Sequence, residues 1–379
     1  MKAFKPLALA VASLVFATAA QADITIGVSL PLTGPASGLG IPVANYIKLW
    51  PNTIAGEKLN VIILDDAGDP TKGVINAKKF VTEDHVDLVI GSAATPVAVA
   101  MSSVMYDAQT TQFMMSPAVL QAGKDAWAFR LPQSTAVMAH AIIEHMKKQG
   151  VKTVGFLGYT DAYGESWLTD FKAQSALLGG PQVVAVERFA RPDTSVTAQA
   201  LKLTAANPQA MLIVASGSGA AMPEMAIVER GYKGKIYQTH AAASRDLMRI
   251  GGKAVEGTFV VSGPAVIAEQ LPDSHPSKKL AIDFVQKYEK AYGVGNRNQF
   301  GAHGYDAWIV LEKIVPEALK KGKPGTQAFR TALRDATETM GRTVVSHGVL
   351  TYSKDNHWGF TTETGVILKV VNGDWKVEQ

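Results

Sequence analysis

Serine and histidine side chains that could supply a nucleophile and a base occur in the chain, but not at the spacing of a hydrolase. A nucleophile elbow needs glycine two residues before its serine, and in Ser216-Gly217-Ser218-Gly219 the position two before Ser218 is Ser216. We interpret this stretch as a flexible turn between a strand and a helix. A hydrolase of aromatic esters that uses Ser218 and a histidine is kept as an alternative.

Metal and nucleotide chemistry have little support in the sequence. His140, Glu144 and His145 lie close together in HAIIEH, but without zincin spacing, so a partly exposed helix face explains them better than a metal site. The chain has no cysteine, and so no disulfide, thiolate metal site or lipid-attachment cysteine. It also lacks a P-loop and a dinucleotide-binding glycine motif, so no cofactor is expected.

Charged side chains follow two expected strands. Asp65 and Asp66 could form an acid pair, but an aspartate at a strand end more often accepts hydrogen bonds in the next turn. Arg130 could hold an anion, or it could brace the chain where it leaves the first series of strands. For all three residues the structural interpretation is favoured.

A threonine at an expected helix start offers binding rather than catalysis. Thr95 precedes Pro96, and proline suits the first helical position. Free backbone amides and the helix dipole at such a position attract anions. Thr95 is therefore a candidate for holding a carboxylate, and capping of the helix alone is compatible with the same geometry.

The elements that must position these residues alternate between strands and helices. Strand signals occur at 24–30, 59–64, 87–90 and 112–115, with helix starts between them, one of them capped by Asp69. The stretch PLTGPASGLG after the first strand is expected to be a loop. Strands separated by helices predict a parallel sheet, which binds ligands at the carboxyl ends of its strands.

A second series of the same kind follows residue 132, so we expect an α/β fold of two Rossmann-like lobes with a ligand cleft between them. Late in the chain Asn372-Gly373 indicates a hairpin turn. The expected helices are 134–149, 163–178, 194–206, 219–230, 276–292 and 301–320, and the expected strands of the second series are 152–158, 182–189, 210–214 and 235–238.

The first 22 residues have the pattern of a cleavable secretory signal. Lys2 and Lys5 precede an apolar run, and the segment ends Ala20-Gln21-Ala22, so the mature chain is expected to begin at Asp23. Removing the two lysines leaves 35 basic residues against 33 acidic ones. This balance gives no reason to expect nucleic acid or an anionic membrane as a partner. Export to the periplasm is predicted.

Taken together, the motifs resemble the periplasmic solute-binding proteins of ABC importers, in the branched-chain amino acid (leucine/isoleucine/valine-binding) family. The resemblance covers essentially the whole mature chain and rests on the order of ITIGVSLPLTGP, LDDAGDP, VIGSAATP, MMSPA, FRLPQ, VGFLGYTDAYGES, VERGYKGKIY and GAHGYDAW. It implies two lobes joined by three crossovers, which close on a ligand and then dock on a membrane permease. It implies that Thr95 binds the ligand carboxylate, that the Ala118 carbonyl and Tyr163 face the ligand, and that Phe300 walls its pocket.

Two positions depart from the amino-acid-binding pattern. The acidic residue that neutralises the ligand's ammonium is absent after the strand 235–238, where the chain has His240, and a threonine often found two residues after Ala118 is Leu120 here. Burying an ammonium without a counter-charge costs several kcal/mol. A carboxylate without an amine fits better, with His240 donating to a polar substituent and the small residues of SGSGAAM leaving room for a ring.

We therefore expect a substrate-binding component of an ABC importer for a small hydrophobic carboxylate, an aromatic acid of benzoate or phenylpropanoid type. The alternatives are a binder of branched-chain or other hydrophobic amino acids, a periplasmic hydrolase and a sensor lobe. We expect a monomer that is not an enzyme, with no metal. The expected lobes are 23–134 with about 265–355, and 135–264 with about 356–379. The expected ligand-binding residues are Leu39, Ala94, Thr95, Ala118, Leu120, Tyr163, Ser218, His240 and Phe300.

Overall fold

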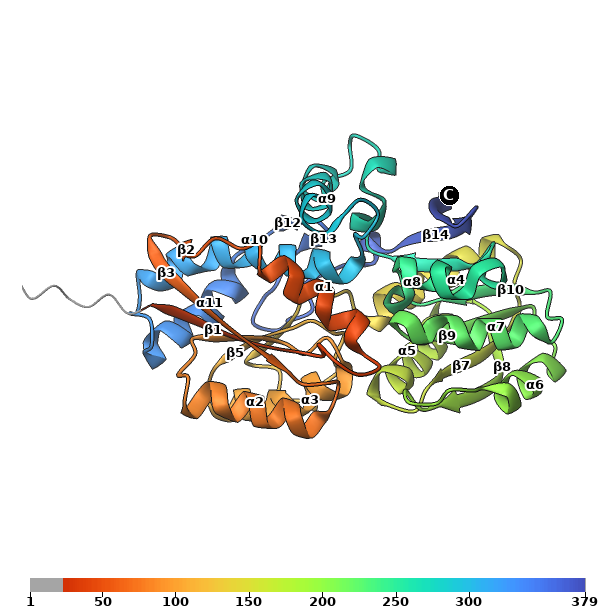
Figure 1. Cartoon of the computed structure of the whole chain (residues 1–379), viewed down its shortest axis with the longest axis horizontal. Coiled ribbons are helices and arrows are strands. Elements are labelled where there is room, and N and C mark those ends of the chain that lie inside the picture. Colours follow the sequence, from red (N-terminus) through yellow and green to blue (C-terminus); the bar gives the residue numbers. More distant parts are fainter. Residues whose placement is uncertain (1–22, 379) are drawn as a thin grey trace, which may run out of the picture.

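The computed structural model describes residues 23–378, apart from the side chain of Ser218. The chain forms two lobes that lie side by side, each built on its own β-sheet (Figure 1). This confirms the expected α/β class with two Rossmann-like lobes. The expected signal peptide, residues 1–22, lies outside the described residues.

The first lobe contains a six-stranded sheet in the order β2-β3-β1-β4-β5-β6. All neighbours pair in parallel except the short β2, which is antiparallel to β3. Because the strands are parallel, their carboxyl ends lie at one edge of the sheet, the edge that meets the second lobe. The strands are β1 (Ile24–Leu30), β2 (Thr53–Ile54), β3 (Glu57–Asp65), β4 (Leu88–Gly91), β5 (Thr111–Met114) and β6 (Ala128–Arg130).

Helices cover both faces of this sheet. In Figure 1, α2 and α3 pack together below it, whereas α1 and α10 pack together above it. Two of the covering helices come from late in the chain, so the lobe is assembled from two separate stretches of sequence. The helices are α1 (Ser37–Ile47), α2 (Pro70–Thr82), α3 (Thr95–Asp107), α10 (Gln299–Leu319) and α11 (Gln327–Thr339).

The second lobe contains a seven-stranded sheet in the order β15-β14-β11-β10-β9-β7-β8. Its first five strands in the sequence are parallel, and β14 and β15 extend one edge as an antiparallel pair. The strands are β7 (Thr153–Tyr159), β8 (Gln182–Phe189), β9 (Ala210–Val214), β10 (Lys235–Gln238), β11 (Phe259–Ser262), β14 (Val366–Val371) and β15 (Asp374–Glu378).

Helix α4 packs with α5, and α7 packs with α6 and α8. Strands β14 and β15 lie beyond residue 365, so the chain returns to the second sheet near its end. The expected lobe boundaries remain predictions. The helices of this lobe are α4 (Thr135–Lys148), α5 (Ala162–Leu178), α6 (Thr197–Ala205), α7 (Ala221–Glu229) and α8 (Arg245–Gly251), with short 3₁₀ turns η1 (Gly217–Ala220), η2 (His240–Ala242) and η3 (Gly252–Val255).

Three segments of chain connect the two lobes, and the amino-terminal half of α10 makes hydrogen bonds to the chain just after β11 and to the turn between β12 and β13. The Gln299 side-chain oxygen accepts hydrogen bonds at 2.9 Å from the Gly263 amide and the Ser262 hydroxyl, just after β11. The Asp306 carboxylate accepts from the backbone amides of Ser346 at 2.7 Å and His347 at 3.3 Å. Nearby elements are η4 (Pro264–Gln270), α9 (Lys278–Tyr292), β12 (Thr343–Val345), β13 (Gly348–Leu350) and η5 (Thr362–Thr364).

Two local signals in the sequence are confirmed. Asp69 caps α2, since its Oδ1 accepts from the amides of Thr71 at 2.7 Å and Lys72 at 3.0 Å. Asn372 and Gly373 have φ of 53° and 69° and join β14 to β15 in a two-residue turn. Left-handed backbone at both central positions is the geometry of a type I′ hairpin.

Two helix starts differ from expectation. Helix α1 begins at Ser37, inside the stretch PLTGPASGLG expected to be a loop, because its buried face packs on α10. Helix α3 has Ala94 as its N-cap, so Thr95 is the first helical residue rather than the cap. Helix α11 has no counterpart among the expected elements, although its apolar face is buried against α10.

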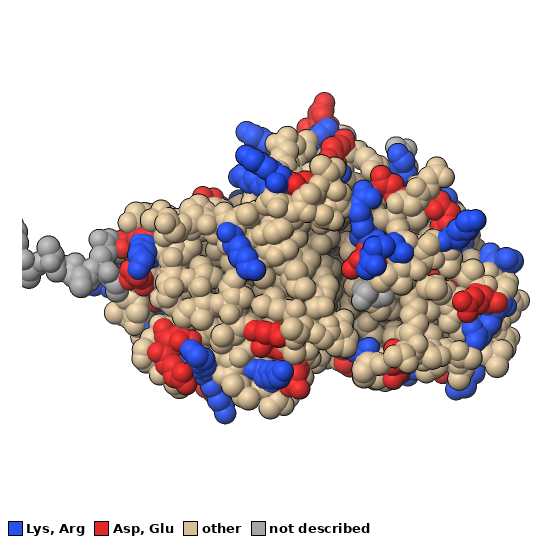
Figure 2. Space-filling view, viewed as in Figure 1, with Lys and Arg blue, Asp and Glu red and all other residues tan. Residues whose placement is uncertain are grey.

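Charged side chains of both signs are interspersed over the face shown in Figure 2. Within residues 23–378 no helix combines the length and apolar character needed to span a membrane. No group of three or more histidine and acidic side chains in that part of the chain is placed to hold a metal ion.

Candidate functional site: a cavity between the lobes

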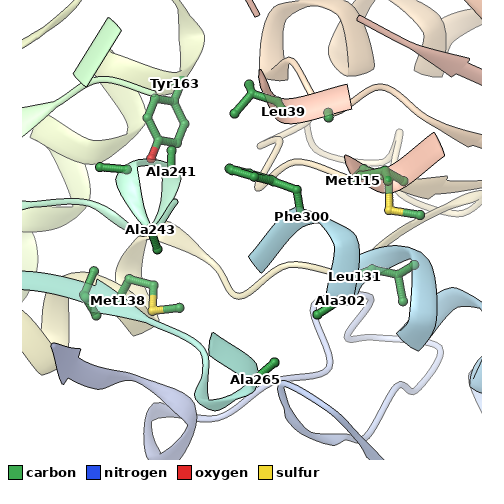
Figure 3. Close-up of a cluster of buried hydrophobic side chains, with 14 of the residues drawn as sticks. Leu39, Met115, Leu131, Met138, Tyr163, Ala241, Ala243, Ala265, Phe300 and Ala302 are labelled. Carbon is green, nitrogen blue, oxygen red and sulfur yellow. The ribbon is translucent and has the colours of Figure 1, made fainter. Parts of the chain in front are cut away.

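A cavity with an empty volume of about 320 Å³ lies between the two lobes. Most of its lining follows the carboxyl ends of strands in the two sheets, where parallel sheets bind ligands. In Figure 3, Tyr163 and Ala241 of the second lobe face Leu39, Met115 and Phe300 of the first. The lining residues are Leu39, Ala93, Thr95, Met115, Pro117, Pro132, Tyr163, Arg191, Ser216, His240, Ala241, Phe300 and His303.

The first lobe presents an apolar wall and one helix terminus. Ala93 and Thr95 follow β4, and Met115 follows β5, so parallel neighbours bring them together. Ala94, the N-cap of α3, makes no side-chain hydrogen bond to the first turn. Because Thr95 is the first residue of α3 and lines the cavity, the positive end of the α3 dipole lies beside the cavity.

The second lobe presents hydrogen-bonding side chains. Tyr163 lies in the first turn of α5, whose N-cap Asp161 accepts from the Tyr163 amide at 2.9 Å. The Tyr163 hydroxyl donates to the Thr239 hydroxyl at 2.8 Å, and burial raises its pKa, so the phenol is neutral. This network fixes the ring as a wall of the cavity.

Among the residues that the structure describes, Arg191 is the one cationic side chain of the lining. Its Nε lies 2.5 Å from Asp161 Oδ2, its Nη1 donates to the Ser216 hydroxyl at 2.9 Å, and its guanidinium lies 4.2 Å from the centre of the Tyr159 ring. The side chain keeps 15% exposure. The guanidinium is therefore held rigidly at the solvent-facing side of the cavity, with its charge partly balanced by Asp161.

Two histidines line the cavity on the side of the lobe connections. His240 is 2% exposed and His303 1% exposed. Burial lowers the pKa of His240 to about 3, with a smaller contribution from His347 nearby. Burial also lowers the pKa of His303 well below its usual value, and again His347 contributes. Both imidazoles are therefore neutral at pH 7.

Five of the predicted ligand residues line this cavity, from both lobes: Leu39, Thr95, Tyr163, His240 and Phe300. Ala94 is buried directly before Thr95 as the helix cap. Ala118 and Leu120 lie away from the lining, in a small apolar cluster with Ala98, Met114 and Ala128. Ser218 lies in η1, and its side chain is outside the described part of the structure.

The Ala118 carbonyl is occupied by another residue of the same lobe. Arg130 Nε donates to the Ala118 oxygen at 2.9 Å, and Arg130 Nη2 lies 2.5 Å from Asp125 Oδ1. The Arg130 guanidinium also lies 4.7 Å from the centre of the Trp358 ring. Arg130 therefore braces the chain that leaves the first lobe, as the sequence favoured, and does not line the cavity.

The aspartates after β3 also act structurally. Asp65 accepts from the Thr33 hydroxyl and from the amides of Leu32 and Ala67 at 2.8 Å each. These hydrogen bonds, with that of Thr33 the strongest, outweigh the effect of burial and lower the pKa of Asp65. Asp66 accepts from the Ser29 hydroxyl at 3.1 Å, and its burial raises its pKa. They hold the loops at the strand edge, as expected for strand-end aspartates.

Sequence reasoning missed three polar residues of the lining: Arg191, Ser216 and His303. Arg191 and Ser216 follow β8 and β9 directly, so a search of strand ends would have found them. His303 lies three residues after Phe300 in α10, on the same helix face.

A cavity lined from both lobes, at the strand ends of two parallel sheets, is the arrangement in which α/β proteins bind small ligands. The chain matches the periplasmic binding protein family over residues 23–370 and belongs to that family. The family is one of binding proteins, which confirms that the chain is not an enzyme and that its compartment is the periplasm.

Known relatives agree with this family. A Leu/Ile/Val-binding protein homolog 3 from Brucella melitensis is 28% identical over 65% of this chain and 69% of that protein. The crystal structure of an extracellular ligand-binding receptor from Rhodopseudomonas palustris is 45% identical over 94% of this chain and 99% of that chain, with a TM-score of 0.92. A solute-binding protein of an R. palustris ABC transporter, solved with benzoate, shares the fold at 19% identity over 94% and 95% of the two chains, with a TM-score of 0.76.

Proposed function

We propose that this protein binds a small aromatic carboxylate between its lobes and delivers it to the permease of an ABC importer. One observation carries the proposal: the cavity lining includes one cationic side chain, Arg191, and no acidic one among the described residues. A cavity of that charge favours an anion over a zwitterion.

Two groups on opposite walls are suited to the carboxylate. The first is the amino-terminal end of α3 with the Thr95 hydroxyl, which offers backbone and side-chain donors. The second is Arg191, whose planar guanidinium matches a carboxylate's two oxygens. A carboxylate held by both would bridge the lobes, so its binding would stabilise the closed form.

The remaining walls suit an aromatic ring. Leu39, Met115 and Phe300 provide apolar and aromatic contact from the first lobe, and Tyr163 faces them from the second (Figure 3). The distant R. palustris solute-binding protein of the same fold was solved in complex with benzoate, which supports an aromatic acid as the ligand here.

The rival ligand is a branched-chain amino acid, which the names of relatives favour. Its ammonium would need a carboxylate as partner. The carboxylate beside Arg191, that of Asp161, already has its hydrogen bonds and ion pair within the protein. Asp161 accepts from the amides of Tyr163 and Gly164 and pairs with the Arg191 guanidinium. An unpaired buried ammonium costs several kcal/mol, enough to abolish useful affinity.

Isothermal titration calorimetry with benzoate, 3-phenylpropanoate and leucine tests the proposal. We expect the aromatic acids to bind and leucine to give no heat. In a parallel melting assay, a ligand at a hundred times its dissociation constant should add about 2.7 kcal/mol of stability. Tight leucine binding without any response to the aromatic acids would overturn the aromatic assignment and leave the family intact.

A further inference from the structure

Three buried ring nitrogens at the cavity have no protein partner among the described residues. They are Nδ1 of His240 and both nitrogens of His303. Both rings line the cavity and are at least 98% buried. A buried polar atom without a partner is costly, so these nitrogens indicate a place where a polar group of the ligand is received.

The surroundings of the two rings hold them in place. The His303 ring centre lies 4.5 Å from that of His347, whose Nδ1 lies 2.8 Å from the Asp306 carboxylate. The His240 ring packs against Trp167, with 5.8 Å between the ring centres. The two histidines thus come from different lobes, His240 from η2 and His303 from α10, and both are fixed by aromatic packing.

The protonation state of these rings selects the kind of group they receive. Burial keeps both imidazoles neutral, so each ring has one N–H donor and one acceptor nitrogen. A hydroxyl both donates and accepts, so it can accept from the N–H of one ring and donate to the acceptor nitrogen of the other. A second carboxylate only accepts, so it could pair with N–H groups but with no acceptor nitrogen, and a methyl group would leave every nitrogen unpaired.

The position of the histidines places this group away from the carboxylate. Arg191 keeps some exposure, whereas the His303 ring packs at a tilt against His347, whose backbone oxygen accepts from Gln133 in the chain between the lobes. A ligand that meets Arg191 and Thr95 with its carboxylate therefore extends its ring toward the histidines.

We propose that His240 and His303 form a subsite for a hydroxyl on the ring of the ligand, so that the preferred substrates are hydroxylated aromatic acids. This inference rests on the proposed function and narrows it from aromatic acids in general to those with a phenolic hydroxyl. The hydroxyl would contact both lobes through His240 and His303, just as the carboxylate would contact both lobes through Arg191 and Thr95.

The test is calorimetry on the whole mature protein with benzoate, 3-hydroxybenzoate and 4-hydroxybenzoate, and with 3-phenylpropanoate and its 3- and 4-hydroxyphenyl analogues. We expect at least one hydroxylated acid to bind about tenfold or more tightly than its parent, the effect of one well-placed hydrogen bond. Equal binding of parent and hydroxylated acids would overturn the subsite, because water would then serve the histidines equally well.

His303→Phe separates recognition from packing, because phenylalanine keeps a flat ring beside His347 but has no nitrogen. We expect the preference for the hydroxylated acid over its parent to vanish. Weakened binding of both acids with the preference intact would assign His303 a packing role and overturn the proposal. His240→Phe, read the same way, serves if His303→Phe fails to fold.

His140→Phe on α4 is the matched control, since His140 is absent from the cavity lining and should leave both affinities unchanged. Failure of the two proposals gives different results. If no aromatic acid binds to the wild type, the proposed function is wrong; if aromatic acids bind without regard to the hydroxyl, only the subsite is wrong.

Discussion

The two walls of the cavity are chemically different. The first lobe contributes mainly apolar contact and a helix terminus, with Leu39, Met115 and Thr95. The second contributes a guanidinium, whose charge Asp161 partly balances, and neutral hydrogen-bonding groups, with Arg191 and His240. A ligand resting on the first wall alone would leave its charge largely in water. The difference indicates that charge recognition is completed only when the lobes meet, so closure and selectivity are one event.

Among the changes proposed here, removing the charge of Arg191 from the second wall should weaken ligand binding most. We expect Arg191→Met to weaken binding of an aromatic carboxylate by about a hundredfold, as for the loss of a partly buried charged hydrogen bond. Calorimetry measures the change. The control is Arg188→Met, because Arg188 pairs with Glu165 at the surface and does not line the cavity. Equal affinity in both variants would remove Arg191 from ligand recognition.

The neutral histidine of the second wall predicts a pH dependence of stability. The folded-state pKa of His240, about 3, lies below its ordinary 6.5. Between these values the unfolded chain binds a proton that the folded chain does not, so this residue makes stability fall as pH drops below 6.5. From pH 7 to pH 5 the loss is about 2 kcal/mol.

Comparison with a variant isolates this contribution. Burial raises the pKa of Glu224 to about 7, so this group makes the protein less stable as pH rises. Its effect on the pH dependence of stability is therefore opposite to that of His240. We expect His240→Phe to lose about 2 kcal/mol less than the wild type between pH 7 and pH 5, measured by urea unfolding at each pH. If both proteins lost the same amount of stability, folding would not lower the pKa of His240, and the residue would be protonated in the folded protein at pH 5.

The closure of the two lobes can be tested at Gly38 and Gly217, where their backbones come close together. A Cβ added to Gly38 of α1 would lie 3.7 Å from the Gly217 Cα of the second lobe, an ordinary contact. A longer side chain would wedge the lobes apart. We expect Gly38→Leu to weaken ligand binding about tenfold by disfavouring the closed form, and Gly38→Ala to have little effect. Solution scattering should show that the Gly38→Leu protein stays more extended with ligand present.

The first wall should give the smallest effect. Thr95→Ala removes one hydroxyl from the cavity while the α3 terminus remains, so we expect affinity to fall about fivefold without loss of thermal stability. Thr95→Ser, which restores the hydroxyl, should recover most of the affinity. A fall as large as that of Arg191→Met would mean that the first wall carries the charge recognition, and the contrast between the walls would be wrong.

The sequence predicted the elements better than the contacts between distant parts of the chain. Buried strands such as β1 and β9 and the capped start of α2 are set by local residue patterns, and they lie within a residue or two of expectation. The start of α1 was missed because its helix is stabilised by packing on α10, more than 250 positions later, which no local window contains.

Contacts between residues far apart in the sequence also limited the prediction of the site. Leu39, Thr95, Tyr163, His240 and Phe300 were found because they follow strand ends or match a family motif. Arg191 was missed because nothing local distinguishes it from a surface arginine; its role depends on β8 lying beside β7. Ala118 lies outside the lining because its carbonyl is held by Arg130, a hydrogen bond that the sequence could not show.

Each lobe is made from two stretches separated by most of the other lobe. The first sheet needs α10 and α11 to cover one face, and the second sheet gains β14 and β15 only after residue 365. Contacts across such separations form slowly. During synthesis, therefore, neither lobe can reach its final packing until the last third of the chain has emerged. We therefore expect the two lobes to complete their folding together, once the whole chain is available.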